Sequence, residues 1–268
     1  MRAALLTAGL LLLAALSAEA GTAPDQEETL AKSRAVLGNT LPDLAFRDTD
    51  GRTVRLAELR GRPLLVSLVY TACSDICPTL IQNLYPIIEN AQEMFGADSF
   101  RVVTVGFDAA RDTPERMRSF ARQQGVDLPG WMFLSADQDT IDALTEAVGF
   151  TVYPLAGGFG HLAQVTVVDA DGRIYRQIYG SDFDPPQIVE PLKDLVYGRY
   201  RPMQGFEDVL DRIRLFCTVY DPDSGRYYFN YALIIRLVIG GGALLLVLFV
   251  IVREWRRSSP RPGPSSLR

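Results

Sequence analysis

Two cysteines and the only histidine of the chain are the residues whose types could do chemistry. Cys73 and Cys77 are separated by three residues, and His161 lies far along the sequence. Two thiolates and one imidazole form a soft ligand set that suits monovalent copper, and a cysteine pair after an apolar strand also suits disulfide chemistry. The function depends on which of these two uses applies.

The expected position of the cysteines favours thiolates in either use. Cys77 is predicted in the first turn of a helix and Cys73 just before it, so their spacing can place both sulfurs on the same side of the helix start. Unpaired amides and the helix dipole at that end stabilise negative charge. Zinc competes with copper for such ligands, but a structural zinc site normally has four protein ligands. The sequence supplies no clear fourth ligand, so copper is favoured.

The first 20 residues have the pattern of a secretory signal peptide. Arg2 gives a positive start, residues 3–16 are apolar, and Ala18 and Ala20 form a small-x-small cleavage pattern. The mature chain is therefore expected to face an oxidising compartment, where a cysteine pair readily becomes a disulfide. Residues 21–37 form an acidic leader in this interpretation.

Residues 231–252 predict a single transmembrane helix. This apolar run is interrupted only by Arg236, and as a helix it would rise about 33 Å, enough to cross a bilayer. The tail, residues 253–268, is rich in arginine and is expected in the cytoplasm by the positive-inside rule. We expect a single-pass protein of the bacterial inner membrane with its functional domain in the periplasm.

The remaining chain has room for one domain, residues 38–198, and a juxtamembrane tether, residues 199–230. The net charge of −5 gives no basic stripe for nucleic acid. Proteins or ions are the expected partners.

Alternating and apolar patterns predict the order of strands and helices in this domain. A short hairpin around Asp50-Gly51 comes first, and a strand buried on both faces, residues 63–70, leads into the cysteine loop. The later elements are a helix at 75–95, a strand at 101–107, a helix starting near 112–115, a strand at 131–134, a helix at 138–148, a glycine-rich loop to His161, a hairpin of 163–168 and 173–179, and a helix at 186–196. This order predicts an α/β, thioredoxin-like fold with an N-terminal hairpin extension, followed by the C-terminal transmembrane helix.

Three features together resemble the Sco (SenC) family of copper proteins. They are the run Y-T-A-C-S-D-I-C-P at residues 70–78, Asp108 followed by R-D-T-P at residues 111–114, and the single distant histidine. The resemblance covers roughly residues 38–198. It implies a thioredoxin-like fold that binds copper through Cys73, Cys77 and His161.

The resemblance also implies a cellular role and partners. Members of the family help to assemble the copper A centre of cytochrome c oxidase, as copper donors, as thiol reductases, or as both. The implied partners are the oxidase subunit that carries this centre and a thiol reductant. This chain departs from the pattern of many members at Gly160, where an acidic residue often precedes the histidine, and in having a C-terminal rather than an N-terminal anchor.

Three functions are weighed, and whether the protein is an enzyme stays open. A membrane-tethered copper chaperone uses all three residues as ligands. A thiol-disulfide reductase uses Cys73 and Cys77 as catalytic residues and has no obligatory use for His161. A peroxidase of the peroxiredoxin type is disfavoured because Thr71-Ala72-Cys73 lacks the expected Thr-x-x-Cys spacing.

Four further residues have open roles. Cys217 is a candidate free thiol, intermolecular bridge or extra ligand. Asp108 and Asp112 are candidate carboxylates near the metal loop, although Asp112 also suits a helix cap. The peptide bond before Pro154 is a candidate cis bond near the cysteines.

Overall fold

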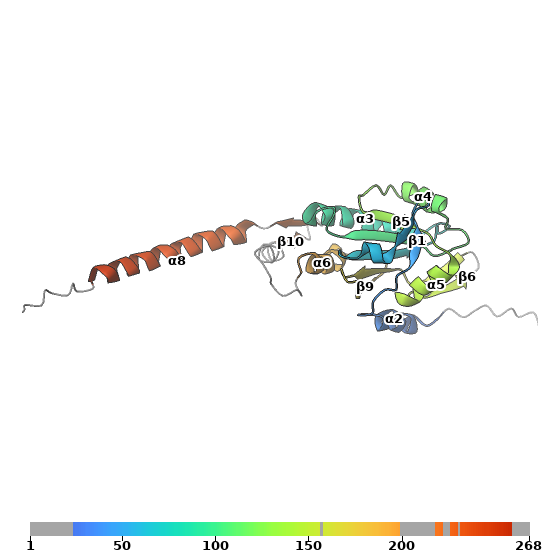
Figure 1. Ribbon diagram of the computed structural model, residues 1–268, viewed down its shortest axis with the longest axis horizontal. Helices are drawn as coiled ribbons and strands as arrows, with labels where there is room; N and C mark the ends of the chain where they lie inside the picture. Colours follow the sequence, from blue (N-terminus) through green and yellow to red (C-terminus); the bar gives the residue numbers. More distant parts are fainter. Residues whose placement is uncertain (1–23, 156–157, 199–217, 222–225, 230, 259–268) are drawn as a thin grey trace, which may run out of the picture. The chain divides into compact units, whose positions relative to one another are not determined.

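The computed structural model describes residues 24–155, 158–198, 218–221, 226–229 and 231–258 (Figure 1). The chain divides into two units, Met1–Val196 and Tyr197–Arg268. Cys217 lies outside the described residues.

A five-stranded mixed sheet forms the centre of the first unit (Figure 1). The strand order is β5-β4-β3-β8-β9, in which β3 pairs parallel with β4 and β4 with β5, whereas β8 is antiparallel to both β3 and β9. The bounds are β3 (Leu64–Val69), β4 (Arg101–Gly106), β5 (Trp131–Leu134), β8 (Gln164–Val168) and β9 (Ile174–Tyr179). All six residues of β3 are buried, as its apolar run predicted for a strand covered on both faces.

Four helices of the predicted order are present, with ends that differ by one or two residues from the prediction. They are α3 (Ile76–Phe95), α4 (Pro114–Gln123), α5 (Gln138–Ala147) and α6 (Pro185–Val196). In α3 one apolar face is buried and includes Leu80, Leu84 and Ile88, which explains why this sequence forms a helix against the core. The α/β prediction is confirmed.

The predicted N-terminal hairpin is also present. It consists of β1 (Ala45–Arg47) and β2 (Thr53–Arg55), paired antiparallel with Phe46 opposite Val54, and the short helix η1 (Leu56–Leu59) follows. Gly51 has φ +77°, the left-handed conformation that glycine adopts without steric cost. Phe46 is buried, so the hairpin is joined to the apolar core.

The α-helix at the start of the described chain was not predicted. Helix α2 (Gln26–Ala35) begins after Asp25, whose carboxylate accepts a hydrogen bond from the amide of Glu27. Its buried Ser33 donates to Gln164 Oε1 at 2.7 Å and accepts from the Tyr179 hydroxyl at 3.1 Å. The acidic leader therefore contains a helix that is joined to the sheet by polar contacts.

The segment before His161 also differs from its prediction. In place of a glycine-rich loop, β6 (Val152–Leu155) and β7 (Gly158–His161) form an antiparallel hairpin that is separate from the main sheet. The prediction of a loop was wrong. It rested on the preference of glycine for turns, whereas β6 pairs with this glycine-rich segment and holds it as a strand. No cis peptide bond occurs among the described residues, so the bond before Pro154 is trans.

The second unit contains a two-stranded ribbon and a long helix. Strands β10 (Thr218–Asp221) and β11 (Arg226–Phe229) pair antiparallel, and helix α8 spans Tyr231–Ser258. The described part of the chain contains no helix that reaches the length and hydropathy of a membrane span.

Candidate metal centre

The cysteine loop connects the end of β3 with the first turn of α3. The Cys73 amide donates to the carbonyl of Tyr70 at 3.0 Å, which curls the loop back on itself. Helix α3 starts at Ile76, so Cys77 occupies its first turn as predicted. The Cys77 amide donates to Cys73 Sγ at 3.4 Å, an example of an unpaired helix amide that binds a sulfur.

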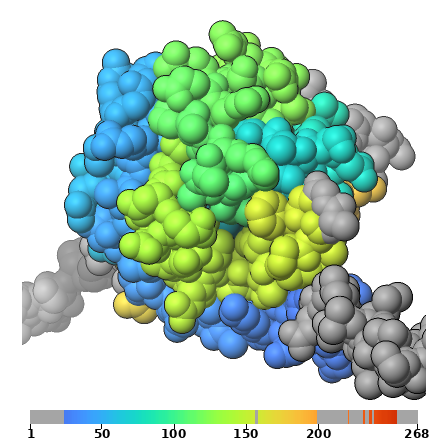
Figure 2. Space-filling model, turned by 90° about the vertical axis from the view of Figure 1, so that its right-hand side faces the viewer, coloured from blue at the N-terminus to red at the C-terminus, as the bar shows by residue number. Residues whose placement is uncertain are grey.

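His161 is the last residue of β7 and faces the cysteine loop. Its Nε2 lies 3.9 Å from Cys77 Sγ, although 84 positions separate the two residues. Figure 2 shows the hairpin of β6 and β7, in yellow, beside the start of α3, in cyan. The structure therefore brings Cys73, Cys77 and His161 together, through one sulfur-amide and one sulfur-imidazole contact.

The distance between Cys77 Sγ and His161 Nε2 is close to that between two ligands of one metal ion, but slightly longer. Two ligands that share a metal at 2.0–2.3 Å lie about 3.5–3.8 Å apart, slightly less than the 3.9 Å between Cys77 and His161. Within the described residues, no three His, Cys, Asp or Glu side chains are arranged to hold an ion as they stand. An ion bound here would have to draw these side chains together.

The two thiols differ in exposure and acidity. Burial acts to raise the pKa of Cys73, but hydrogen bonds from the amides of Cys77 and Asp75 outweigh it, so the pKa lies below its usual value. Cys77 is only 1% exposed, and burial raises its pKa far above the usual range, with a further contribution from the charge of Cys73. Both sulfurs are free thiols in the structure, and Cys73 is the one that solvent reaches.

The imidazole of His161 is enclosed by aromatic rings. The ring centroids of Tyr70, Phe107 and Phe150 lie 6.3, 5.4 and 5.3 Å from its own. Burial lowers the pKa of His161, with a partial offset from the backbone of Leu162, so the neutral, metal-binding form is favoured. Its Nδ1 is buried and has no hydrogen-bond partner within the described residues. The donor set, two sulfurs and a neutral imidazole nitrogen in an apolar surround, fits a soft metal ion.

Asp112 is joined to the cysteine loop rather than to a helix cap. Its Oδ1 accepts from the amide and the hydroxyl of Thr71 at 2.9 and 2.7 Å, and its Oδ2 accepts from the amide of Asp108 at 2.9 Å. The residue that caps α4 is Thr113, whose hydroxyl accepts from the amide of Arg116. The cap prediction for Asp112 was therefore wrong. Its contact with Thr71, two residues before Cys73, joins the loop after β4 to the cysteine loop.

Asp108 does not reach the sulfurs through any hydrogen bond of the described chain. Its carboxylate pairs with Arg111 at 3.1 Å, and its backbone amide is held by Asp112. Asp108 is buried, whereas Arg111 is largely exposed. Asp108 therefore belongs to the loop that supports Asp112.

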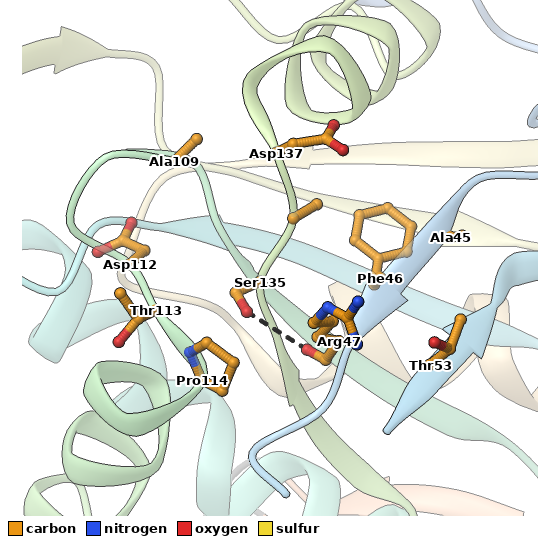
Figure 3. A pocket seen from close by; sticks show the side chains of 11 residues that line it. Ala45, Phe46, Arg47, Thr53, Ala109, Asp112, Thr113, Pro114, Ser135 and Asp137 are labelled. Atoms are coloured by element: carbon orange, nitrogen blue, oxygen red, sulfur yellow. Dashed lines mark hydrogen bonds between the residues drawn. The ribbon is translucent and has the colours of Figure 1, made fainter. Parts of the chain in front are cut away.

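A cavity of about 400 Å³ is lined in part by Asp112 and Thr113 (Figure 3). Arg47 and Thr53 from the N-terminal hairpin and Asp137 from the start of α5 line it. Figure 3 shows Asp112 and Thr113 at one side and Phe46 at the other. Cys73, Cys77 and His161 are not among its lining residues, so this cavity is distinct from the cysteine site.

Several residues that shape the site were missed by sequence reasoning. Tyr70, Phe107 and Phe150 were predicted only as parts of strands or left unassigned, yet their rings surround His161. Tyr70 and Phe107 follow the last residues of adjacent parallel strands, and that position at one sheet edge is the signal that could have found them.

Comparisons with known proteins agree with this fold. A family model described as SCO1/SenC matches residues 37–197. A protein of Stutzerimonas stutzeri named "Putative copper-binding protein" is 24% identical over 62% of this chain and 83% of its own length. The bovine "Protein SCO2 homolog, mitochondrial" is 29% identical over 73% of this chain and 71% of its own length.

A solved structure resembles the first unit as a fold. It is that of BsSco, described as having a disulfide switch and as a member of the Sco family of cytochrome c oxidase assembly proteins. It shares 22% identity, covers 60% of this chain and 95% of its own, and has a TM-score of 0.51. The family match extends over more than half of the sequence and includes the cysteine loop and the histidine. The chain belongs to the SCO1/SenC family.

Proposed function

We propose that this protein is a copper chaperone that helps to assemble the copper A centre of cytochrome c oxidase. Cys73, Cys77 and His161 hold the copper ion and pass it to the oxidase subunit by ligand exchange. The observation that carries the proposal is the convergence of two sulfurs and one imidazole nitrogen at the start of α3. The names of the Stutzerimonas relative and of the Sco structure support the copper and the oxidase parts of it.

The difference in exposure between the ligands suggests the order in which they let copper go. Cys77 is buried and His161 is enclosed by aromatic rings, whereas Cys73 is partly exposed. An incoming thiolate of the acceptor therefore reaches the ion from the side of Cys73. Ligand exchange then begins with the loss of the Cys73–copper bond, while the other two ligands retain the ion.

Membrane anchoring and export are part of the same proposal. Their support is the signal-peptide pattern of residues 1–20 and the apolar run of 231–252 with arginines on its far side. Along α8 the large apolar side chains of residues 244–252 are exposed. Residues 21–230 then lie in the periplasm, where a tether confines donor and acceptor to one plane and raises their effective concentration.

The experiment that tests the proposal is copper transfer to a soluble copper A domain. The reduced full chain is loaded with one cuprous ion and mixed with the copper-free acceptor. We expect the ion to move to the acceptor, as measured by metal analysis after the two proteins are separated. A protein that holds copper but never releases it to this acceptor would contradict the chaperone role.

A thiol-disulfide reductase is the second candidate, and the unequal acidity of the two thiols favours it. The Cys73 thiolate attacks one sulfur of the acceptor disulfide and forms a mixed disulfide, releasing one acceptor thiolate. Cys77 then attacks Cys73, which releases the second acceptor thiol and leaves a Cys73–Cys77 disulfide. Two electrons pass to the acceptor, and an external thiol reductant restores the pair.

Variants that lack one cysteine of the pair test this second function, with Cys217→Ser in every form so that only the pair can react. Cys77→Ser is expected to trap a mixed disulfide through Cys73, seen by non-reducing electrophoresis with the oxidised acceptor. Cys73→Ser is the matched control and is expected to trap little, because Cys77 is buried and its pKa is raised. Equal trapping by both variants would contradict the assigned order of attack.

A further inference from the structure

The strand that carries His161 has little to fix its position. Half of β7 is glycine, at Gly158 and Gly160, and glycine loses more conformational freedom on folding than any other residue. The hairpin of β6 and β7 has no ladder to the main sheet among the described residues. A two-stranded hairpin alone is of marginal stability, and a glycine-rich strand specifies its register weakly. Side-chain packing must therefore hold β7.

Tyr153 supplies that packing opposite Gly160. The two residues are direct partners in the antiparallel pair, and the next pair along is Val152 with His161. A Cβ atom on Gly160 would lie 2.3 Å from Tyr153 Cε2 and Cζ and 2.7 Å from its hydroxyl. The tyrosine ring thus occupies the space above Gly160 that any side chain at this position would need.

The register of this pair decides where the histidine points. Side chains alternate between the two faces of a strand, so a slip of one residue would turn His161 away from Cys77. An aromatic residue that covers a glycine on the neighbouring strand is a known way to hold such a pair. Gly160 is buried, which agrees with a ring that lies over it.

We propose that Tyr153 is a positioning residue for His161. Its ring covers Gly160, fixes the register of β7 and keeps the imidazole Nε2 directed at Cys77. This assignment rests on the proposed function, in which His161 is a copper ligand. It also explains why position 160 has no side chain: the ring of Tyr153 fills the space that a side chain there would need.

The test compares four forms of the reduced full chain: wild type, Tyr153→Ala, Tyr153→Phe and Tyr85→Ala. Tyr85 is a partly buried tyrosine of α3 that packs on Trp131 and has no part in β7, so it controls for a general loss of stability. The first readout needs no metal. Because the chain has one histidine, its ¹⁵N imidazole signals report on His161 alone. The second readout is the dissociation constant for cuprous ion, measured by competition with a chelator.

Tyr153→Ala is expected to shift or broaden the imidazole signals and to weaken copper binding by about 10-fold, the lower end of the effect of residues that orient a metal-binding histidine. Tyr153→Phe keeps the ring and is expected to restore both readouts to within about twofold of wild type. Tyr85→Ala is expected to change neither. Should Tyr153→Ala fail to fold, Gly160→Ala takes its place, since the added methyl group must displace the ring.

Imidazole signals and copper affinity that stay as in wild type after loss of the ring would overturn the assignment. A wild-type chain that binds no copper would instead refute the proposed function. In that case the metal-free imidazole signals still decide whether Tyr153 positions His161.

Discussion

At the scale of single residues, four-residue spacing gives Cys73 and Cys77 opposite properties. One sulfur lies outside the helix end and receives amide hydrogen bonds, and the other is inside the first turn and buried. A thiolate at Cys73 suits both copper binding and attack on a disulfide, whereas Cys77 becomes a thiolate only at a high cost unless a metal replaces its proton. Copper binding and the reduction of an acceptor disulfide thus compete for the same two cysteines.

Asp112 gives a pH-dependent prediction at this scale. Burial raises the pKa of this carboxyl, and the hydrogen bonds from Thr71 and Asp108 only partly offset it. Between about 3.9, the value for an unfolded aspartate, and the raised folded value, the folded state holds the proton more tightly. The contribution of Asp112 to the free energy of unfolding therefore falls as the pH rises through this window.

The Asp112→Asn variant removes this titration. We expect the stability of wild type relative to the variant to decrease as the pH rises from about 4 toward neutrality. Urea unfolding of the metal-free chain, followed by circular dichroism at several pH values, measures this difference. A difference that is independent of pH would refute the raised pKa of Asp112.

The chemistry of the three candidate ligands could be predicted from residue types, but their supporting contacts could not. The cysteine spacing and the lone histidine are visible in the sequence, and the structure brings them together. The hydrogen bond from the Thr71 amide to Asp112 joins positions 41 residues apart. In the sequence, Asp112 stands directly before a helix start, so helix capping was the simpler interpretation of its carboxylate. Such tertiary contacts leave no periodic signal.

At the scale of elements, hydrophobic patterns predicted the main sheet, whereas helix α2 and strand β7 have no such pattern and were missed. Strands β3, β4 and β5 appear where mainly apolar runs occur in the sequence. Helix α2 was missed because it has no apolar face: its buried residues are Thr29 and Ser33. Strand β7 was missed because its glycines resemble a turn.

Helix α2 gives the prediction at this scale. Ser33→Ala removes the hydroxyl that bridges Gln164 and Tyr179, leaving the buried Gln164 carbonyl without that donor. We expect a loss of about 1–3 kcal/mol in the free energy of unfolding, the usual cost of an unsatisfied buried polar group. Lys32→Ala, at the exposed neighbouring position, is the control and is expected to change stability by less than about 0.5 kcal/mol. Equal stability of both variants in urea would argue against a docked α2.

At the scale of the whole molecule, the proposal combines an exported copper domain with a membrane anchor. We expect the full chain to remain in the membrane fraction after alkaline extraction, and a chain ended after residue 230 to be released into the periplasmic fraction. Immunoblotting of the fractions measures this. A full chain recovered in the soluble fraction would exclude residues 231–252 as an anchor.

The same chain offers a direct test of its central chemistry, the copper site at Cys73, Cys77 and His161. The measurement is the stoichiometry and affinity of cuprous ion for the reduced full chain, with Cys217→Ser in every form so that only the proposed ligands vary. We predict one tightly held copper, weakened at least 10-fold in His161→Ala and lost in the Cys73→Ser/Cys77→Ser variant. Copper that binds equally well without His161, or a reduced wild-type chain that binds none, would contradict the account.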